Sequence, residues 1–111
     1  MTNIQIANTI LSQLGGNRFI VMTGAKNLMA TENGLRFRIG KNAGKVTHVE
    51  ITLNGWDLYD MTFTKFTPGR LNKKTYEWID EKVQTIADFE NLYNDQLEDI
   101  FTQVTGLYTR I

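Results

Sequence analysis

The dipeptide Asn54-Gly55 separates two stretches in which apolar and polar residues alternate, Val46–Leu53 and Trp56–Phe66. Asn-Gly tolerates the positive φ angles that a tight turn needs, and a period of two is typical of β-strands. The sequence therefore predicts an antiparallel hairpin, and this is the strongest local structural signal in the chain.

A two-residue turn at this point fixes which residues face each other, and Ile51 then lies opposite Leu58. In that register the apolar positions change face within the second strand, from Trp56 and Leu58 to Met61 and Phe63. Either a bulge near Leu58 resets the register, or both faces of the sheet are covered, one by each terminal helix. We favour coverage of both faces.

An amphipathic helix is predicted over residues 3 to 14, where apolar residues recur at helical spacing. Thr2 and Gln5 have the spacing of a capping box at its beginning, and Gly15-Gly16 supplies a stop at its end. This segment is therefore expected to pack one apolar stripe against the sheet.

Short β-rich runs follow this helix and predict three further strands, Arg18–Thr23, Asn27–Thr31 and Leu35–Ile39. Between the last two, Glu32-Asn33-Gly34 has the residues of a hairpin turn. The first half of the chain is therefore expected to be one helix followed by antiparallel strands.

The second half is less uniform. Thr67-Pro68-Gly69 is predicted to be a turn that closes the sheet. The segment Tyr76–Glu90 fits either a helix or a strand, and we favour a helix over Tyr76–Lys82 while the remainder stays open. A last helix is predicted from about residue 94 to 105, because apolar residues recur at helical spacing and Gly106 follows as a terminator.

These elements predict a single α+β domain over residues 1–111, with an antiparallel sheet of about four strands flanked by an N-terminal and a C-terminal helix. Trp56 and Trp78 are expected in the core, as large apolar residues usually are. No apolar run approaches the roughly 20 residues that cross a bilayer, and the first residues lack the pattern of a secretory signal. We therefore expect a cytoplasmic protein.

The composition argues against catalysis. The chain has no cysteine and one histidine, which excludes disulfides, thiolate chemistry and metal centres built on Cys or His. Asp57 and Asp60 are predicted on opposite strand faces, which argues against a shared metal ion. The segment Gly40–Thr47 has the glycines and lysine of a phosphate-binding loop, but its spacing is one residue short and it links two strands. We therefore expect a non-enzymatic protein without a metal or cofactor.

Charge is distributed unevenly along the chain, although the formal net charge is zero. The segment up to Thr75 contains ten Lys and Arg residues and four Asp and Glu residues, which gives it a net charge of +6. From Tyr76 onward, two basic residues face eight acidic ones, a net charge of −6. Such asymmetry indicates an anionic partner for one surface, or two surfaces that neutralise each other.

Arg36 and Arg38 alternate with apolar residues, so both guanidinium groups should leave the same face of one strand, about 7 Å apart. Lys41 and Lys45 extend this basic stripe, and an exposed Tyr59 or His48 would add stacking to a single-stranded nucleic acid. Alternatively, the arginines pair with acidic residues such as Glu50, Asp60 or those of the last helix. The candidate nucleic-acid-binding residues are Arg36, Arg38, Lys41, Lys45, Lys26 and His48.

Three blocks of the sequence, LGGNRFIVMTGAKN, ITLNGWDLYDMTF and DQLEDIFTQVTGLYT, span most of the chain. Together they resemble a family of small, functionally uncharacterised proteins encoded by bacteriophages, prophages and mobile elements. The resemblance implies expression in the cytoplasm of a bacterial host. It implies no catalytic or binding residue.

The leading functional hypothesis is a nucleic-acid-associated phage or mobile-element protein that binds through its basic hairpin. A second hypothesis is a module that binds a host protein, such as a nucleic-acid-guided defence effector, and inhibits or redirects it. A third is a homo-oligomeric structural component in which an acidic helix meets the basic sheet of the next copy. The second hypothesis rests on the acidic residues Glu90, Asp95, Glu98 and Asp99.

Overall fold

The computed structural model describes residues 2–109. Three helices, one short 3-10 turn and seven strands follow one another in this part of the chain. They are α1 (Asn3–Leu14), α2 (Asn17–Thr23), β1 (Lys26–Thr31), β2 (Gly34–Arg38), β3 (His48–Leu53), β4 (Tyr59–Thr67), β5 (Arg70–Asn72), β6 (Glu77–Ile79), β7 (Lys82–Leu92), η1 (Asn94–Gln96) and α3 (Leu97–Thr105).

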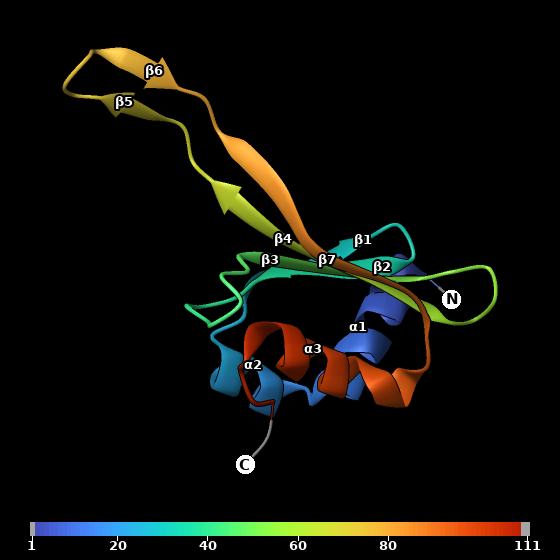
Figure 1. Cartoon of the computed structure of the whole chain (residues 1–111). Coiled ribbons are helices and arrows are strands. Elements are labelled where there is room, and N and C mark those ends of the chain that lie inside the picture. Colours follow the sequence, from blue (N-terminus) through green and yellow to red (C-terminus); the bar gives the residue numbers. More distant parts are fainter. Residues whose placement is uncertain (1, 110–111) are drawn as a thin grey trace.

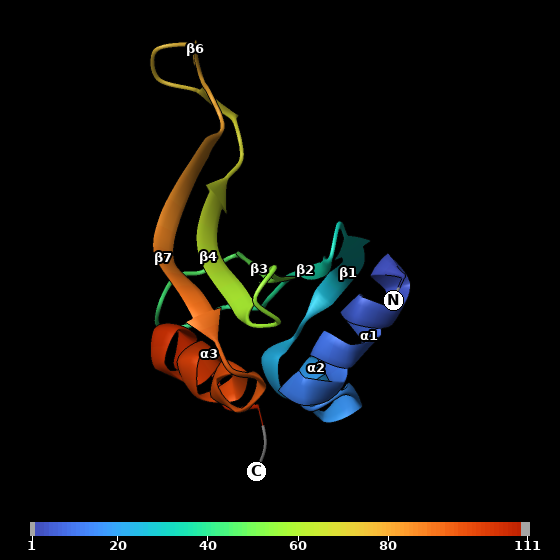
Figure 2. The same cartoon turned by 90° about the vertical axis from the view of Figure 1, so that its right-hand side faces the viewer.

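Five strands form an antiparallel sheet in the order β1-β2-β3-β4-β7, and β5 pairs with β6 in a separate ribbon. All the helices lie on one face of the sheet, α1 against β1 and β2, and α3 beneath β4 and β7 (Figures 1 and 2). The predicted α+β class is confirmed, with five strands in the sheet. Coverage of both faces is wrong, because both terminal helices occupy the same face and leave the other one open.

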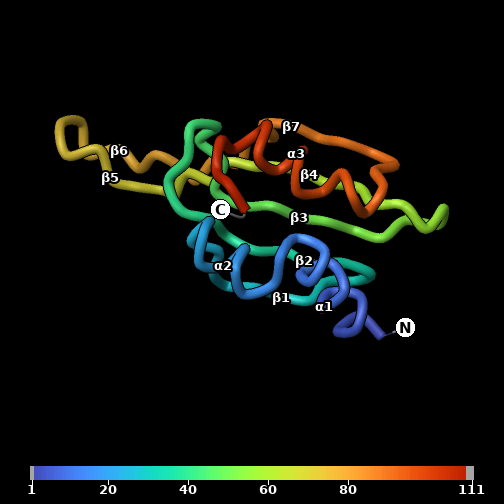
Figure 3. The backbone as a smooth tube through the Cα atoms, turned by 90° about the horizontal axis from the view of Figure 1, so that it is seen from below, coloured from blue at the N-terminus to red at the C-terminus, as the bar shows by residue number. Residues whose placement is uncertain are grey.

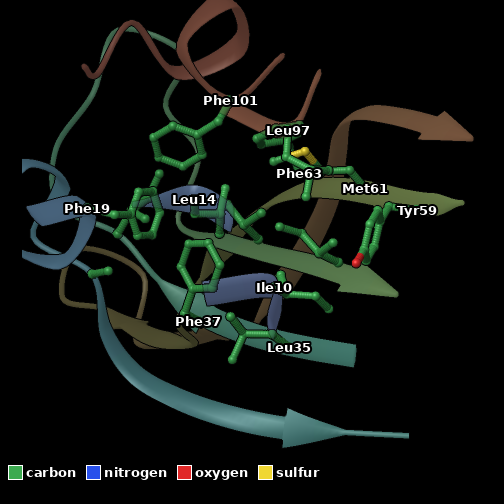
Figure 4. Close-up of a cluster of buried hydrophobic side chains, with 14 of the residues drawn as sticks. Ile10, Leu14, Phe19, Leu35, Phe37, Tyr59, Met61, Phe63, Leu97 and Phe101 are labelled. Atoms are coloured by element: carbon green, nitrogen blue, oxygen red, sulfur yellow. The ribbon is translucent and has the colours of Figure 1, made fainter. Parts of the chain in front are cut away.

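The core lies between the helices and the sheet (Figure 4). Phe19 of α2 packs edge-to-face on Phe37 of β2 and on Phe101 of α3, with ring centroids 5.4 and 5.1 Å apart. Phe63 of β4 contacts Phe101 from the sheet side, and all four rings are buried. One aromatic cluster therefore joins both helical ends of the chain to the middle of the sheet.

The first helix begins and ends as the sequence predicted. The Thr2 hydroxyl accepts a hydrogen bond from the Gln5 backbone N–H, and the Gln5 side chain accepts one from the Thr2 N–H. Gly15 ends the helix at φ 124°, an angle that suits glycine. None of the helices in residues 2–109 is long and apolar enough to cross a lipid bilayer.

The run Arg18–Thr23, predicted as a strand, is instead part of helix α2. Phe19 and Thr23, four residues apart, are the buried positions of this helix, and the Thr23 hydroxyl donates to the Phe19 carbonyl over 2.7 Å. Burial of Phe19 in the aromatic cluster overrides the β propensity of the run, because propensity is weaker than tertiary packing. Gly24, in the left-handed region, ends the helix.

The predicted two-residue turn at Asn54-Gly55 is also wrong. Leu53 pairs with Tyr59, so the loop between the strands has five residues, and Ile51 faces Met61 instead of Leu58. The Asn54 side chain shapes this longer loop by accepting hydrogen bonds from the Trp56 and Leu58 N–H groups. In the observed register Val49 and Ile51 share one buried face with Tyr59, Met61 and Phe63, so the predicted change of face near Leu58 does not occur.

The segment Tyr76–Glu90 consists of β6 and most of β7, with a short link between them and no helix, so the helix predicted over Tyr76–Lys82 is wrong. Pro68-Gly69 does not reverse the chain either. It separates β4 from β5, and the reversal comes after Asn72, where β5 turns into β6. The β5–β6 ribbon therefore extends the β4–β7 hairpin into an arm that rises from the sheet on the side opposite the helices (Figures 1 and 2).

Both tryptophans lie at the surface, which contradicts their expected place in the core. Trp56 is 80 % exposed in the β3–β4 loop, and Trp78 is 65 % exposed on the arm. Trp78 covers Gly69, since a Cβ added at this glycine would come within 2.7 Å of the indole ring. The core is filled instead by phenylalanine and aliphatic residues.

Candidate nucleic-acid interface

Strand β2 separates its charges from the core by simple alternation. Leu35 and Phe37 are buried beneath the helices, whereas Arg36 and Arg38 are exposed. Successive side chains of a strand point to opposite faces, so both guanidinium groups leave the same face of the strand, as predicted. In the structure this is the open face of the sheet.

The strand register brings two other candidate residues beside Arg38. Lys26 of β1 and His48 of β3 are its direct partners on either side. Lys26 shares this face because β1 carries a bulge at Asn27, where φ is +55°. Asparagine adopts positive φ more readily than most residues, so the bulge is encoded locally.

The alternative, in which acidic residues neutralise the arginines, fits only Arg36. Its partner on β3 is Glu50, an exposed residue of the open face. Asp60, in contrast, accepts hydrogen bonds from the Asn54 side chain and from the Asn91 N–H at the far side of the sheet. Helix α3 lies on the opposite face, so its acidic residues are separated from Arg36 and Arg38 by the sheet.

Two open depressions adjoin at Arg38 and contain all six candidate residues. The first has a volume of about 460 Å³ and the second about 590 Å³. The first is lined by Lys26, Arg38, Ile39, Gly40, Lys41, Asn42, Lys45, Val46 and Thr47. The second is lined by Asn27, Leu28, Met29, Arg36, Phe37, Arg38 and His48.

The loop between β2 and β3 holds Lys41 and Lys45 at the rim of the first depression. The Asn42 side chain fastens the loop from inside, donating to the carbonyls of Gly40 and Val46 and accepting from the Val46 N–H, over 2.7 to 3.0 Å. Both lysines are exposed, and Lys45 has a positive φ of 58°. The loop is therefore a defined structure that presents its cations outward.

The glycines of this loop have structural roles. Gly44 packs directly on α3, where an added Cβ would overlap the Val104 carbonyl oxygen, and its N–H points to the Thr105 carbonyl over 3.4 Å. Gly40 donates to the Thr23 carbonyl at the end of α2. The glycines therefore anchor the loop to two helices, which explains the superficial likeness to a phosphate-binding loop.

His48 is a polar but uncharged member of the site at neutral pH. Partial burial, followed by the nearby charges of Arg36 and Arg38, lowers the pKa of His48 below its ordinary value of 6.5. Its Nδ1 lies 2.8 Å from the Thr47 hydroxyl, and its ring meets Phe66 edge-on at 6.1 Å. The positive charge of the site therefore comes from lysine and arginine.

Three other residues considered for stacking or catalysis, Tyr59, Asp57 and Asp60, lie outside the two depressions. Tyr59, considered for base stacking, is buried on the helix side of the sheet. Asp57 lies in the β3–β4 loop with a positive φ, and Asp60 is held by Asn54 and Asn91. Among residues 2–109, no group of three or more His, Asp or Glu side chains is arranged to hold a metal ion.

The four acidic candidates lie near the end of β7, in η1 and in the first turn of α3. Glu90, Asp95 and Asp99 are exposed, while Glu98 accepts a hydrogen bond from the Thr109 hydroxyl over 2.8 Å. Glu98 and Asp99 occupy the first turn of α3, where negative charge stabilises a helix. Helix formation therefore accounts for part of this acidic surface.

Sequence reasoning missed the residues that hold the site in shape, namely Asn42 and Gly44, and also Met29 in the second depression. The tendency of asparagine side chains to bond to nearby backbone in turns was an available signal for Asn42. Gly44 gave no such signal, because its close approach to α3 depends on the tertiary fold.

Comparisons with protein-family models, curated proteins and solved structures find no match to the chain. The bacteriophage and mobile-element context therefore stays a prediction that rests on the three sequence blocks.

Proposed function

We propose that the protein binds the phosphate backbone of a nucleic acid through the two depressions that meet at Arg38. The observation that carries this proposal is that all six candidate residues line these adjoining depressions, which extend from the open face of the sheet to the β2–β3 loop. Clustered cations that track a backbone are the general means of binding nucleic acids without reading their sequence.

Order along the sheet strengthens the proposal. Neighbouring strands follow one another in the chain from β1 to β4, so the basic first part of the sequence becomes the basic side of the sheet. The acidic residues of the last part of the chain fall on β6, β7, the link between them, η1 and the first turn of α3, at the other side. A polyanion that approaches the β1–β2 side therefore meets a positive potential. The acidic surface lies at the other side and reduces this potential only slightly.

Salt dependence is the quantitative signature of this mode of binding. Five cations line the depressions, Lys26, Arg36, Arg38, Lys41 and Lys45. If each one displaces a counterion from duplex DNA, the logarithm of the binding constant falls with the logarithm of salt concentration with a slope of about −4 to −5.

Fluorescence anisotropy with labelled single-stranded and duplex oligonucleotides, at several salt concentrations, tests the proposal. Arg38→Gln should weaken binding and make the slope shallower by about one unit. Arg18→Gln, which removes an exposed cation from α2 on the helix side, is the matched control and should change neither quantity. Absence of binding by the unaltered protein at low salt would sink the proposal.

A protein partner is the alternative, supported by the exposure of Glu90, Asp95 and Asp99. In this reading the acidic surface occupies a basic groove of a host factor and inhibits or redirects it. Pull-down of the partner would then be weakened by Asp99→Lys and unaffected by Arg38→Gln, the reverse of the pattern expected for nucleic acid. A homo-oligomer that joins acidic and basic surfaces would instead dissociate as salt rises, which light scattering measures.

A further inference from the structure

The arm carries cations that the two depressions do not include. Lys65 lies near the end of β4, and Arg70, Lys73 and Lys74 lie on β5 and in the turn that follows it. The last three line a third open depression, of about 270 Å³, whose lining contains no acidic residue. Its lining residues are Arg70, Leu71, Asn72, Lys73, Lys74 and Ile79.

Charge is segregated across the arm. The β5 strand and the turn are basic, whereas the acidic residues Glu77, Asp80 and Glu81 belong to β6 and the link that follows it. Because β5 continues β4, its free edge lies on the side of β3, and β6 lies on the outer side with β7. The basic edge of the arm therefore belongs to the same side of the molecule as the depressions at Arg38.

The arm and the basic face also meet directly. The Phe66 N–H, at the base of the arm, donates to the Thr47 hydroxyl over 2.7 Å, and the Phe66 ring packs edge-on against His48. The β2–β3 loop, with its lysines, lies near the point where the arm leaves the body (Figure 3). The arm rises on the side of the open face, so the arm and the sheet enclose an angle (Figure 1). The basic edge of the arm lies on one side of this angle, and the basic residues of the open face lie on the other.

The tip of the arm exposes an aromatic ring beside its lysines. Tyr76 is 81 % exposed and has a φ of +57°, and its N–H donates to the Asn72 carbonyl over 2.7 Å. Positive φ is costly for a bulky residue, and such strain is concentrated at functional positions. Trp78 differs, because it covers Gly69 and lines a separate depression together with Asp80 and Glu81.

We infer that the arm is a second nucleic-acid contact, in which Arg70, Lys73 and Lys74 bind phosphates and Tyr76 stacks on an exposed base. The inference rests on the proposed function and extends it, because it makes the bound segment span the body and the arm. The longest dimension of the molecule is 50 Å. This corresponds to about 15 base pairs at about 3.4 Å per pair.

Duplexes of different length distinguish the contribution of the arm to binding from that of the body. With labelled duplexes of about 8 and about 30 base pairs, only the longer one spans both surfaces. The Lys73→Gln/Lys74→Gln variant should bind the longer duplex about 10-fold more weakly, with a salt slope shallower by about two units, and should bind the short one as the unaltered protein does. Arg38→Gln should weaken binding to both lengths.

The matched control is Arg18→Gln/Lys82→Gln, which removes two exposed cations from α2 and from the outer strand β7. It should leave both lengths unaffected. Tyr76→Ser should weaken single-stranded binding by about 5-fold or more and duplex binding much less, because only unpaired bases stack on a side chain. Far-UV circular dichroism checks that each variant is folded.

Unchanged affinity and salt slope of the Lys73/Lys74 variant on the long duplex would overturn the inference while leaving the proposed function intact. So would a loss of self-association in sedimentation velocity without a loss of nucleic-acid binding, since the arm would then be a protein contact. Absence of binding by the unaltered protein would overturn both.

Discussion

Replacement of Asn42 by alanine tests whether the basic loop is held in shape from inside. The Asn42 side chain makes three hydrogen bonds, to the Gly40 carbonyl and to both backbone groups of Val46. Val46 is only 2 % exposed, so its N–H has little access to water once the side chain is removed. At about 0.5–1.5 kcal/mol for each hydrogen bond, and more for a buried group left unpaired, the loss should be about 2–4 kcal/mol.

Urea unfolding followed by far-UV circular dichroism measures this loss as a lower free energy of unfolding. Asn42→Asp retains the acceptor for the Val46 N–H but turns a carboxylate toward the Gly40 and Val46 carbonyls, so it should not restore stability. Asn17→Ala, at an exposed position in the first turn of α2, is the control and should cost less than about 0.5 kcal/mol. A loss below about 1 kcal/mol for Asn42→Ala would refute the assigned role.

The same variant links loop structure to binding. Asn42→Ala removes no charge, yet it frees Lys41 and Lys45 from the positions that the loop gives them. Anisotropy titrations should therefore give weaker nucleic-acid binding at every salt concentration. Unchanged affinity in a variant with the expected loss of stability would mean that the shape of the loop does not matter for binding.

Three further predictions follow from particular contacts. Gly44→Ala, whose Cβ would overlap the Val104 carbonyl, should lower the free energy of unfolding by about 1–3 kcal/mol, whereas Gly40→Ala meets only ordinary contacts and should be tolerated. Phe101→Ala should cost about 3–5 kcal/mol in urea unfolding and Trp56→Ala less than about 0.5, and equal losses would contradict the observed core. The pKa of His48 is lower in the folded protein than its ordinary 6.5, so the contribution of His48 to stability is complete above pH 6.5 and is lost as pH falls toward the folded pKa. The difference in free energy of unfolding between the unaltered protein and His48→Gln should therefore shrink as pH falls below 6.5. A difference that does not depend on pH would contradict the lowered pKa.

Local signals in the sequence were sufficient where one residue decides the backbone. The capping box of Thr2 and Gln5 and the stop at Gly15 fixed both ends of α1. The alternation around Arg36 and Arg38 assigned these side chains to one common face of the strand, although the sequence could not say which face the last helix covers. These features depend on neighbours within a few residues, so the sequence contains them directly.

Features set by tertiary contacts could not be predicted in this way. Burial of Phe19 converts a β-rich run into a helix, and the Asn54 side chain replaces a tight turn by a loop that also bonds to Asn91. The arm misled the prediction because its strands bury almost nothing, so Trp78 and its neighbours lack the apolar pattern of a packed strand. The shape of the candidate site is likewise tertiary, since the loop depends on the contact of Gly44 with α3.

The order of strands in the sheet has a consequence for synthesis of the chain. From β1 to β4, each strand pairs with the one made just before it, and β7 pairs with β4 after the excursion of the arm. The sheet can therefore assemble in step with translation, because such pairings close only short loops. Helix α3 packs on the sheet last, because Phe101 can contact Phe19 and Phe63 only when residues 97–105 have left the ribosome. A chain interrupted before α3 would present this apolar face to proteases and chaperones.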